Sequence, residues 1–377
     1  MEEWKECKFK DLYRIPSKNG LSKPSRVRGS GYKMINMGEL FSNDRIYNIP
    51  MELVPLTDTE KENAKVEVND LLFARQSLIV EGAGKCSIVM ETDELTVFES
   101  HIIRVRLNPE LAYPPFFYYY FKNKNSPIRA IIQHCVQAGI KASDLAEITV
   151  KVPPLPTQQK IAVILSSLDD KIELNNKINT NLQQQAQALF KNWFVDFEPF
   201  GGKMPEGWKV GKLSELINVK YGKDHKKLAD GNYPVYGSGG IMRYVDKFLY
   251  DKESVLIPRK GTLNNVFYIN EPFWSVDTMF YTEMKKENIA KYVYFFVKGK
   301  DLNSMNAGSA VPSMTTEILN AIEVVIPSDE YLEKFENIVS PMFKQIKQCI
   351  IENENLASIR DTLLPKLMNG EITVDKI

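Results

Sequence analysis

Basic and amide side chains follow short apolar runs at two places in the chain, and these residue types suit the recognition of nucleic-acid bases. Arg75, Gln76 and Ser77 come directly after the apolar run Leu71–Ala74. A similar run, Val255–Pro258, precedes a loop that holds Arg259, Lys260, Gly261, Thr262 and Asn264. Arginine binds guanine, and asparagine or glutamine binds adenine, with two hydrogen bonds each in the major groove. The spacing therefore predicts two strand-end loops that contact DNA bases.

A glycine-rich segment and several lysines extend the set of candidate contacts. The segment consists of Tyr236, Gly237, Ser238, Gly239 and Gly240, and glycine lets the backbone approach a ligand closely. The remaining candidates are basic or amide residues in comparable places, namely Lys33, Asn36, Lys141, Lys223, Lys226 and Lys227. For each of these residues taken alone, a structural role in a turn or on a solvated surface stays open.

Positive charge is concentrated early in each half of the chain. Residues 12–38 contain six basic residues and no acidic residue, and residues 203–265 contain 12 basic against 7 acidic residues. The whole chain carries 48 basic and 48 acidic residues, which excludes a uniformly basic coat. Because duplex DNA carries one phosphate charge per roughly 1.7 Å of axis, both stretches are predicted to face DNA. A solvated charged surface is the alternative interpretation.

No set of residues predicts a catalytic, metal or cofactor site. The four cysteines lie far apart and the chain has three histidines, so the clustered ligands of a zinc site are missing. The segment Tyr113–Phe116 lacks the leading amide or carboxylate of an amino-methyltransferase motif. The segment Gly82–Cys86 lacks the first glycine and the final Ser or Thr of a phosphate-binding loop. The chain is therefore expected to be non-catalytic and to carry no metal or cofactor.

No stretch approaches the roughly 20 apolar residues of a membrane span. The first residues are charged and lack an apolar signal core. The sequence therefore predicts a cytoplasmic protein without membrane contact.

The elements that position these residues occur twice. The run Ile148–Pro153 matches Ile322–Pro327 in the second half, and the aromatic run Phe117–Phe121 matches Tyr292–Phe296. Trp4 is matched by Trp208 at the start of the second half. The order of these anchors is preserved while loop lengths differ, so the chain is predicted to consist of two similar halves.

Each half ends in a long helix with a heptad seam. Apolar or asparagine residues recur at alternating spacings of four and three from Ile161 to Trp193, which is typical of a coiled coil. Shifting these positions by the offset between Ile148 and Ile322 gives a second seam, which is weakened by Arg360. Pro341 is expected to kink or delay that helix. We expect the helices to pair antiparallel, with Trp193 opposite Phe335, and a register shifted by one heptad is also compatible with the pattern.

The expected fold class is α+β. Two similar mixed α/β domains, residues 1–153 and 199–327, are separated by two long antiparallel coiled-coil helices with pseudo-two-fold symmetry. The first spacer helix is predicted at 154–198, and the second, with the C-terminal tail, at 328–377. Three aromatic residues beside the first seam suggest a surface for docking of partners, namely Phe190, Phe194 and Phe197.

Several motifs closely resemble the specificity subunits of type I restriction–modification systems. The central match comprises Pro153–Ala162, Leu165–Asn175 and Ala186–Phe197. Further matches are Tyr233–Gly240, Ile257–Gly261 and Leu363–Ile372. The resemblance covers nearly the whole chain and is weakest in the first domain.

The resemblance implies that each recognition domain reads one half of an asymmetric, bipartite site in double-stranded DNA, while the helices fix the gap. It also implies two modification (methyltransferase) subunits and restriction (translocase/nuclease) subunits as partners, which would use S-adenosylmethionine, ATP and Mg²⁺. Two alternatives remain: a recognition fragment of a fused restriction–methylation enzyme, and a coiled-coil protein-interaction scaffold without a DNA-reading function.

Overall fold

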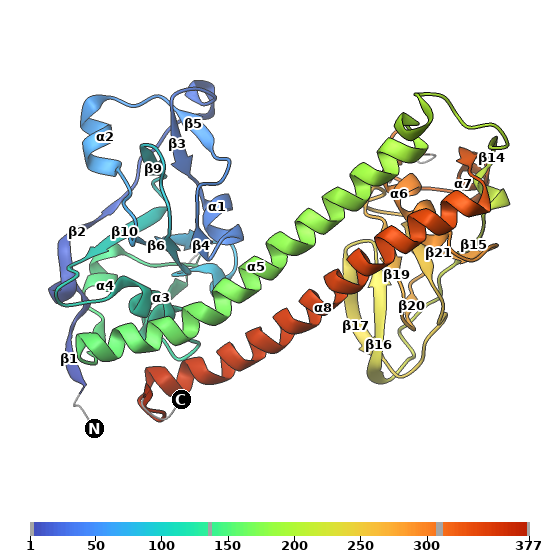
Figure 1. The fold of residues 1–377 in the computed structure, drawn as a ribbon. Helices are drawn as coiled ribbons and strands as arrows, with labels where there is room; N and C mark the ends of the chain where they lie inside the picture. The colour runs from blue at the N-terminus through green and yellow to red at the C-terminus, as the bar shows by residue number, and fades with distance from the viewer. Residues whose placement is uncertain (1–3, 135–137, 307–311, 375–377) are drawn as a thin grey trace. The chain divides into compact units, whose positions relative to one another are not determined.

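Two helices of 40 residues each, α5 (Leu155–Phe194) and α8 (Asp329–Met368), are the longest elements (Figure 1). The computed structural model describes residues 4–134, 138–306 and 312–374. The chain divides into unit 1, residues 1–174 and 352–377, and unit 2, residues 175–351. Each unit therefore contains about half of each long helix.

The long helices pair antiparallel within each unit, as the heptad seams predict. In unit 1, Asp169 of α5 binds Arg360 of α8 at 2.5 Å. In unit 2, the rings of Trp193 and Phe335 are 6.4 Å apart, in the predicted register. In unit 1 the N-terminal half of α5 packs against the C-terminal half of α8. In unit 2 the C-terminal half of α5 packs against the N-terminal half of α8.

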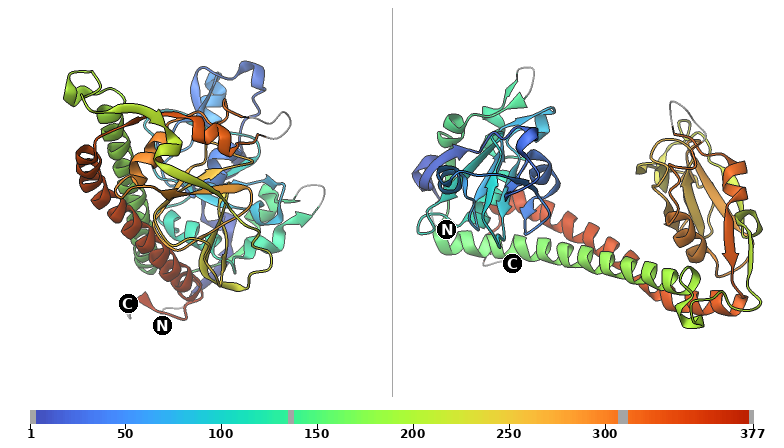
Figure 2. Two further views of the ribbon diagram at one scale, coloured as in Figure 1. Left: turned by 90° about the vertical axis from the view of Figure 1, so that its right-hand side faces the viewer. Right: turned by 90° about the horizontal axis from the view of Figure 1, so that it is seen from above.

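Pro341 does not delay α8, and that part of the prediction is wrong. The helix begins at Asp329, well before the proline, and its first turn carries the acidic residues Asp329 and Glu330. Acidic side chains stabilise a helix N-terminus. Leu332 and Phe335 are buried in the core of unit 2, so packing supports the helix on the N-terminal side of the proline. Both long helices are continuous in the further views of Figure 2.

Unit 1 is built around a five-stranded sheet with the strand order β2-β10-β6-β8-β4. These strands are β2 (Tyr13–Asn19), β4 (Arg45–Ile46), β6 (Leu71–Ala74), β8 (Cys86–Val89) and β10 (Ile102–Leu107). Smaller sheets are formed by β1 (Lys5–Lys8) with β13 (Thr149–Val152), by β3 (Tyr32–Ile35), β5 (Glu52–Val54) and β9 (Thr96–Phe98), and by β7 (Gln76–Ser77), β11 (Gln133–His134) and β12 (Ala138–Gly139). The helices are α1 (Met37–Ser42), α2 (Asp58–Ala64), α3 (Pro114–Lys122) and α4 (Ala142–Ala146).

The aromatic run of unit 1 forms α3, which begins at two prolines, a residue type that fits the first helical turn. Its residues from Phe116 to Phe121 are all buried in the core. The Tyr119 hydroxyl donates to Asp169 of α5 at 2.7 Å. Burial and the neighbouring carboxylate raise the pKa of Tyr119, so this hydroxyl stays protonated as a donor. The helix thus joins the sheet to α5.

Unit 2 repeats this plan around the sheet order β15-β21-β18-β19. The strands are β15 (Ile217–Tyr221), β18 (Ser254–Pro258), β19 (Phe267–Ile269) and β21 (Met279–Met284). The remaining strands are β14 (Lys209–Lys212), β16 (Asp230–Gly237), β17 (Gly240–Val245), β20 (Trp274–Ser275) and β22 (Glu323–Ile326). The helices are α6 (Ala290–Lys298) and α7 (Thr316–Ala321).

Matching strand pairs in the two units agree with the predicted internal repeat. β1 pairs antiparallel with β13, and β14 pairs antiparallel with β22. The large sheets also correspond. In unit 1, β10 lies between β2 and β6, and in unit 2, β21 lies in the same way between β15 and β18. The units differ in their smaller sheets, where unit 2 has the β16–β17 hairpin. Within the described residues, no helix combines the length and apolar character needed to span a membrane.

Candidate nucleic-acid interface

Arg259 directly follows β18 and is fixed to neighbouring segments of unit 2. Its N–H donates to the carbonyl of Thr278 at 2.8 Å, and its carbonyl accepts from the N–H of Met314 at 2.9 Å. Nη1 donates to the carbonyl of Asp277 at 3.2 Å, and the guanidinium carbon lies 5.3 Å from the ring centre of Tyr221. Backbone and side-chain contacts therefore hold the charged group at the end of the sheet.

Arg75 has the equivalent contacts in unit 1, at the end of β6. Its N–H donates to the carbonyl of His101 at 2.8 Å, and its carbonyl accepts from the N–H of Ile140 at 2.9 Å. Nη1 donates to the carbonyl of Ser100 at 3.4 Å. Ile140 and Met314 are related by the same sequence offset as the repeated runs that begin at Ile148 and Ile322. The two arginines predicted from the sequence thus occupy matched positions.

Two glycines, which the sequence prediction missed, allow the backbone to pass close to the segments that bind Arg75 and Arg259. A side-chain carbon would lie 2.0 Å from the carbonyl oxygen of Phe98 if placed on Gly20, and 2.0 Å from that of Val276 if placed on Gly222. Each glycine directly follows the first strand of its large sheet, so the strand end passes tightly against the segment that accepts hydrogen bonds from the arginine. The repeat itself is the signal that could have identified them. Tyr221, which carries the guanidinium of Arg259 and is 52% exposed, was also missed.

The glycine-rich segment forms the tip of the β16–β17 hairpin, beside the Arg259 loop. Nδ2 of Asn265 donates to the carbonyl of Ser238 at 2.7 Å. A side-chain carbon on Gly261 would lie 2.9 Å from the hydroxyl of Ser238. Gly240 and Gly261 have φ values of 111° and 89°, which favour glycine. The structure therefore brings together the two loops that the sequence predicted separately.

The lysines of unit 2 are accessible around these loops. Lys223, Lys226, Lys227 and Lys260 are exposed, and among the residues that the structure describes no carboxylate lies within ion-pair distance of them. Gly239, Gly261 and Thr262 are also exposed. Contact of these residues with DNA stays a prediction, and their exposure is compatible with it.

Tyr236 is buried, so its prediction as a DNA contact is corrected, whereas contact of the exposed Asn264 with DNA stays a prediction. Tyr236 is 7% exposed and packs in a core cluster with Phe273, and burial raises the pKa of its hydroxyl. The Asn264 amide donates to Asp301 at 3.3 Å and accepts from the N–H of Asn303 at 3.2 Å. Tyr236 therefore contributes to the core beside the candidate interface, and the side chain of Asn264 stabilises its own loop.

Lys33 and Asn36 of unit 1 are likewise engaged within the chain. Lys33 forms an ion pair with Glu94 at 2.6 Å. Asn36 precedes α1, where its N–H donates to Glu39 at 2.9 Å, and its side chain accepts from Arg28 at 3.3 Å. These contacts lie within unit 1, and contact of Lys33 and Asn36 with DNA stays a prediction.

The basic stretch of residues 12–38 is not an unopposed positive face. Acidic residues from other segments pair with four of its six cations, and the pairs are Arg14–Glu67, Lys23–Glu60, Arg28–Glu52 and Lys33–Glu94. A count of charges along the sequence cannot include carboxylates that the fold brings from elsewhere. The positive surface of unit 1 is therefore weaker than the sequence indicates.

Gln76, Ser77 and Lys141 lie close to Arg75. Gln76 and Ser77 form β7, which pairs antiparallel with β12. The hydroxyl of Ser77 accepts from the N–H of Ile79 at 3.2 Å, and Lys141 is exposed just before α4. These residues and Arg75 form one strand-end cluster, whose contact with DNA stays a prediction.

The predicted docking surface at Phe190, Phe194 and Phe197 is wrong for its first two members. Phe190 and Phe194 are 4% and 3% exposed, and their rings lie 6.2 and 5.2 Å from that of Phe335. Phe197 is partly buried 6.2 Å from Trp208. These aromatic side chains bind the end of α5 into the core of unit 2, because the faces beside the seam are covered by the domain itself.

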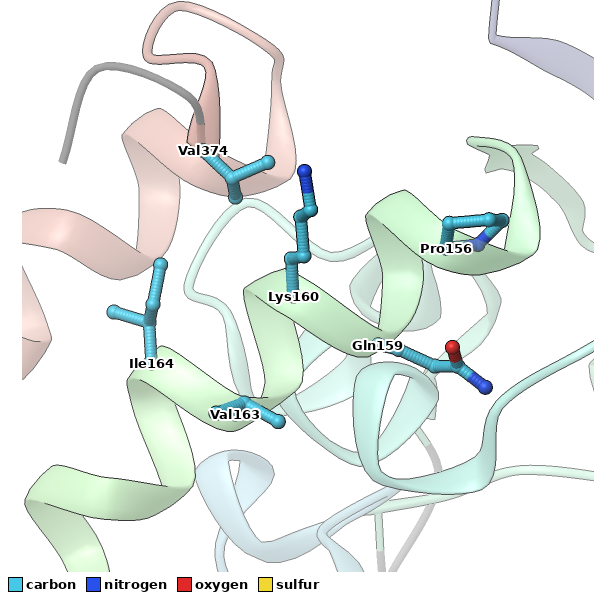
Figure 3. Close-up of a pocket in the computed structure, with 6 residues that line it drawn as sticks. All are labelled: Pro156, Gln159, Lys160, Val163, Ile164 and Val374. Atoms are coloured by element: carbon cyan, nitrogen blue, oxygen red, sulfur yellow. The ribbon is translucent and has the colours of Figure 1, made fainter.

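The described residues contain no group of three or more His, Cys, Asp or Glu side chains placed to hold a metal ion. Figure 3 shows the six residues that line a pocket beside the first turns of α5, namely Pro156, Gln159, Lys160, Val163, Ile164 and Val374. Its lining contains one charged side chain and no carboxylate, histidine or cysteine, so it does not resemble a catalytic pocket.

Comparisons with known proteins agree on one family. A family model described as "Type I restriction modification DNA specificity domain" matches residues 1–184 and 205–360. The MjaIX specificity subunit of Methanocaldococcus jannaschii is 28% identical over 306 residues, which are 70% of each chain. The HindI specificity subunit of Haemophilus influenzae is 24% identical and covers 99% of this chain and 100% of its own. A crystal structure of a type I restriction–modification S subunit from M. genitalium has a similar fold, with a TM-score of 0.64 at 19% identity over 97% of this chain and 96% of its own.

Proposed function

Because the chain belongs to the type I restriction–modification DNA specificity family, we propose that each of its two domains reads one half of an asymmetric, bipartite DNA site. The observation that carries this proposal is the matched placement of Arg75 and Arg259, each fixed at a strand end by equivalent backbone hydrogen bonds. The residue after each arginine differs, with Gln76 in unit 1 and Lys260 in unit 2. Two strand ends with the same backbone contacts but different side chains suit the reading of two different half-sites.

The paired helices would fix the distance between the half-sites. A helix of 40 residues is about 60 Å long. Recognition elements that enter equivalent grooves one turn apart are separated by about 34–36 Å, which a helix of this length can span. The ion pair of Asp169 and Arg360 supports a fixed register, since a buried polar pair penalises sliding of one helix along the other.

The chain would act as the recognition part of a larger assembly. We expect two modification (methyltransferase) subunits and restriction (translocase/nuclease) subunits as partners, and these would bind S-adenosylmethionine, ATP and Mg²⁺. The chain itself would contribute DNA recognition and no catalytic residue, and would function in the cytoplasm. The alternative, a coiled-coil scaffold without DNA reading, is not favoured because the matching family model describes a DNA specificity domain.

The proposal is tested by co-expressing the chain with a modification subunit and mapping methylated adenines in the host genome. We expect one motif made of two different half-sites with a constant gap between them. Binding of the purified complex to that duplex should fall steeply with salt concentration, because phosphate contacts release counterions. A contiguous motif, or binding that does not distinguish the motif from scrambled DNA, would contradict the proposal.

A further inference from the structure

Three consecutive apolar residues project from unit 1 directly after β7. Leu78, Ile79 and Val80 are 87%, 63% and 41% exposed. Single exposed apolar side chains are common on protein surfaces and need no explanation. A run of three at one loop, with its first member almost fully exposed, points to a ligand that offers apolar groups.

The loop that carries this run is held in a defined conformation. The N–H of Ile79 donates to the hydroxyl of Ser77 at 3.2 Å, and the N–H groups of Gly82 and Ala83 donate to the carbonyls of Ile79 and Val80, both at 3.2 Å. The loop then returns to β6, where the N–H of Gly84 donates to the carbonyl of Ala74 at 2.8 Å. The exposed apolar side chains therefore project from a turn that internal hydrogen bonds hold in place.

The run adjoins the candidate DNA-reading residues Arg75 and Gln76. Leu78 lies two positions beyond Gln76, in the bend that directly follows β7. Guanidinium and amide groups read guanine and adenine edges in the major groove. In that groove, the apolar group that a base pair presents is the C5-methyl of thymine.

We propose that Leu78, supported by Ile79, contacts thymine methyl groups in the first half-site and is a specificity determinant there. This inference rests on the proposed DNA-reading function. A glutamine that reads adenine and a leucine two positions later together select a short A·T-containing segment. In unit 2, the loop after Arg259 buries its own leucine, Leu263, and exposes Lys260 and Thr262 instead. Apolar reading by this loop is thus particular to the first half-site.

The test uses the chain assembled with its modification subunits and the mapped duplex, in which each thymine of the first half-site is replaced in turn by uracil. Uracil lacks only the methyl group, so base pairing is preserved. For the unaltered chain, we expect one or two replacements to weaken binding about three- to fivefold, the value for one buried methyl group. In Leu78→Ala, the same replacements should change binding by less than about 1.5-fold, because the side chain and the methyl group are coupled.

Val68→Ala is the matched control. Val68 is 50% exposed and precedes β6, at the opposite end of the strand from Arg75. This variant should keep the full effect of uracil. The proposal is overturned if no thymine shows the effect, or if Leu78→Ala retains it. Loss of the modification subunits from Leu78→Ala with an unchanged uracil effect would assign the loop to a protein contact instead. If the unaltered complex does not distinguish the mapped duplex from scrambled DNA, the proposed function itself fails.

Discussion

Arg259 is a residue whose backbone and side chain are both held by contacts within unit 2. Its backbone contacts fix the strand end, and its guanidinium lies over Tyr221 and donates one hydrogen bond to Asp277. A long side chain loses rotamer freedom when it binds a ligand, so holding it in advance lowers that cost. The remaining N–H groups of the guanidinium stay available for a base.

Replacement of Arg259 by alanine is expected to weaken binding to the cognate duplex by about 1–3 kcal/mol and to relax one position of the second half-site. The reason is the loss of a two-bond contact to one base. Sequencing of methylated adenines measures the relaxed position, and a titration with fluorescent duplex measures affinity. Unchanged methylation confined to the cognate site would contradict the assignment.

Lys223 is expected to contact phosphate instead of bases. It is exposed and follows Gly222 at the edge of the interface. In Lys223→Ala, the slope of log affinity against log salt should become less negative by about 0.9, while the preferred sequence stays the same. Lys347→Ala serves as a control, because Lys347 is paired with Glu271. An altered recognition motif in Lys223→Ala would show that this lysine reads a base.

The sequence predicts Arg75 and Arg259 because each follows an apolar run in a repeated frame. It cannot predict that Lys33 is neutralised, since its partner Glu94 is distant in the sequence and is brought near by the fold. The buried position of Tyr236 was also hidden, because a tyrosine beside glycines is compatible with both a surface turn and a core. The repeated sequence pattern thus identifies the position of a residue, whereas the partners of its side chain depend on the fold.

At the level of elements, a buried polar cluster joins α3, α5 and α8 in unit 1. Asp169 accepts from Tyr119 at 2.7 Å and from Arg360 at 2.5 Å. The seam pattern identifies Arg360 as a weak position, but it does not reveal the compensating carboxylate, which lies 191 positions away in the sequence. The heptads predict the helices and their direction, whereas the cluster depends on three separate segments.

Arg360→Met is expected to destabilise unit 1 by about 3–5 kcal/mol, because it leaves the buried Asp169 without its cation. Urea-dependent hydrogen exchange of residues 161–174 reports the loss. Lys171→Met is the matched control, since it removes the exposed Lys171–Glu352 pair. This control should change stability by less than about 1 kcal/mol. Equal effects of the two variants would show that the Asp169–Arg360 pair has no special role.

For the whole molecule, duplication is the main organising feature, and the repeated sequence anchors reveal it. The repeated anchors mark the matched strands β13 and β22 and the aromatic helices α3 and α6, but they do not predict which strands pair. The sheets that differ between the two units were not predictable, because they arise where the halves have diverged and the sequence shows no repeated pattern. The β16–β17 hairpin of unit 2 is the clearest example.

Insertion of one heptad into residues 175–182 of α5 alone is expected to prevent normal assembly with the modification subunits. It lengthens one helix by about 10 Å and shifts its seam against an unchanged partner. Gel filtration of the co-expressed complex and mapping of the methylated motif measure the effect. Normal assembly with an unchanged gap would argue against paired helices as the spacer.

The hydrogen bond from Tyr119 to Asp169 has a practical consequence for exchanging recognition domains between related proteins. A grafted first domain would have to supply its own hydroxyl donor above this carboxylate, or the recipient helix would carry a poorly solvated acceptor. Compatibility of a chimera therefore depends on an aromatic helix outside the candidate DNA-contacting loops, and a designer should transfer or restore that tyrosine together with the new specificity.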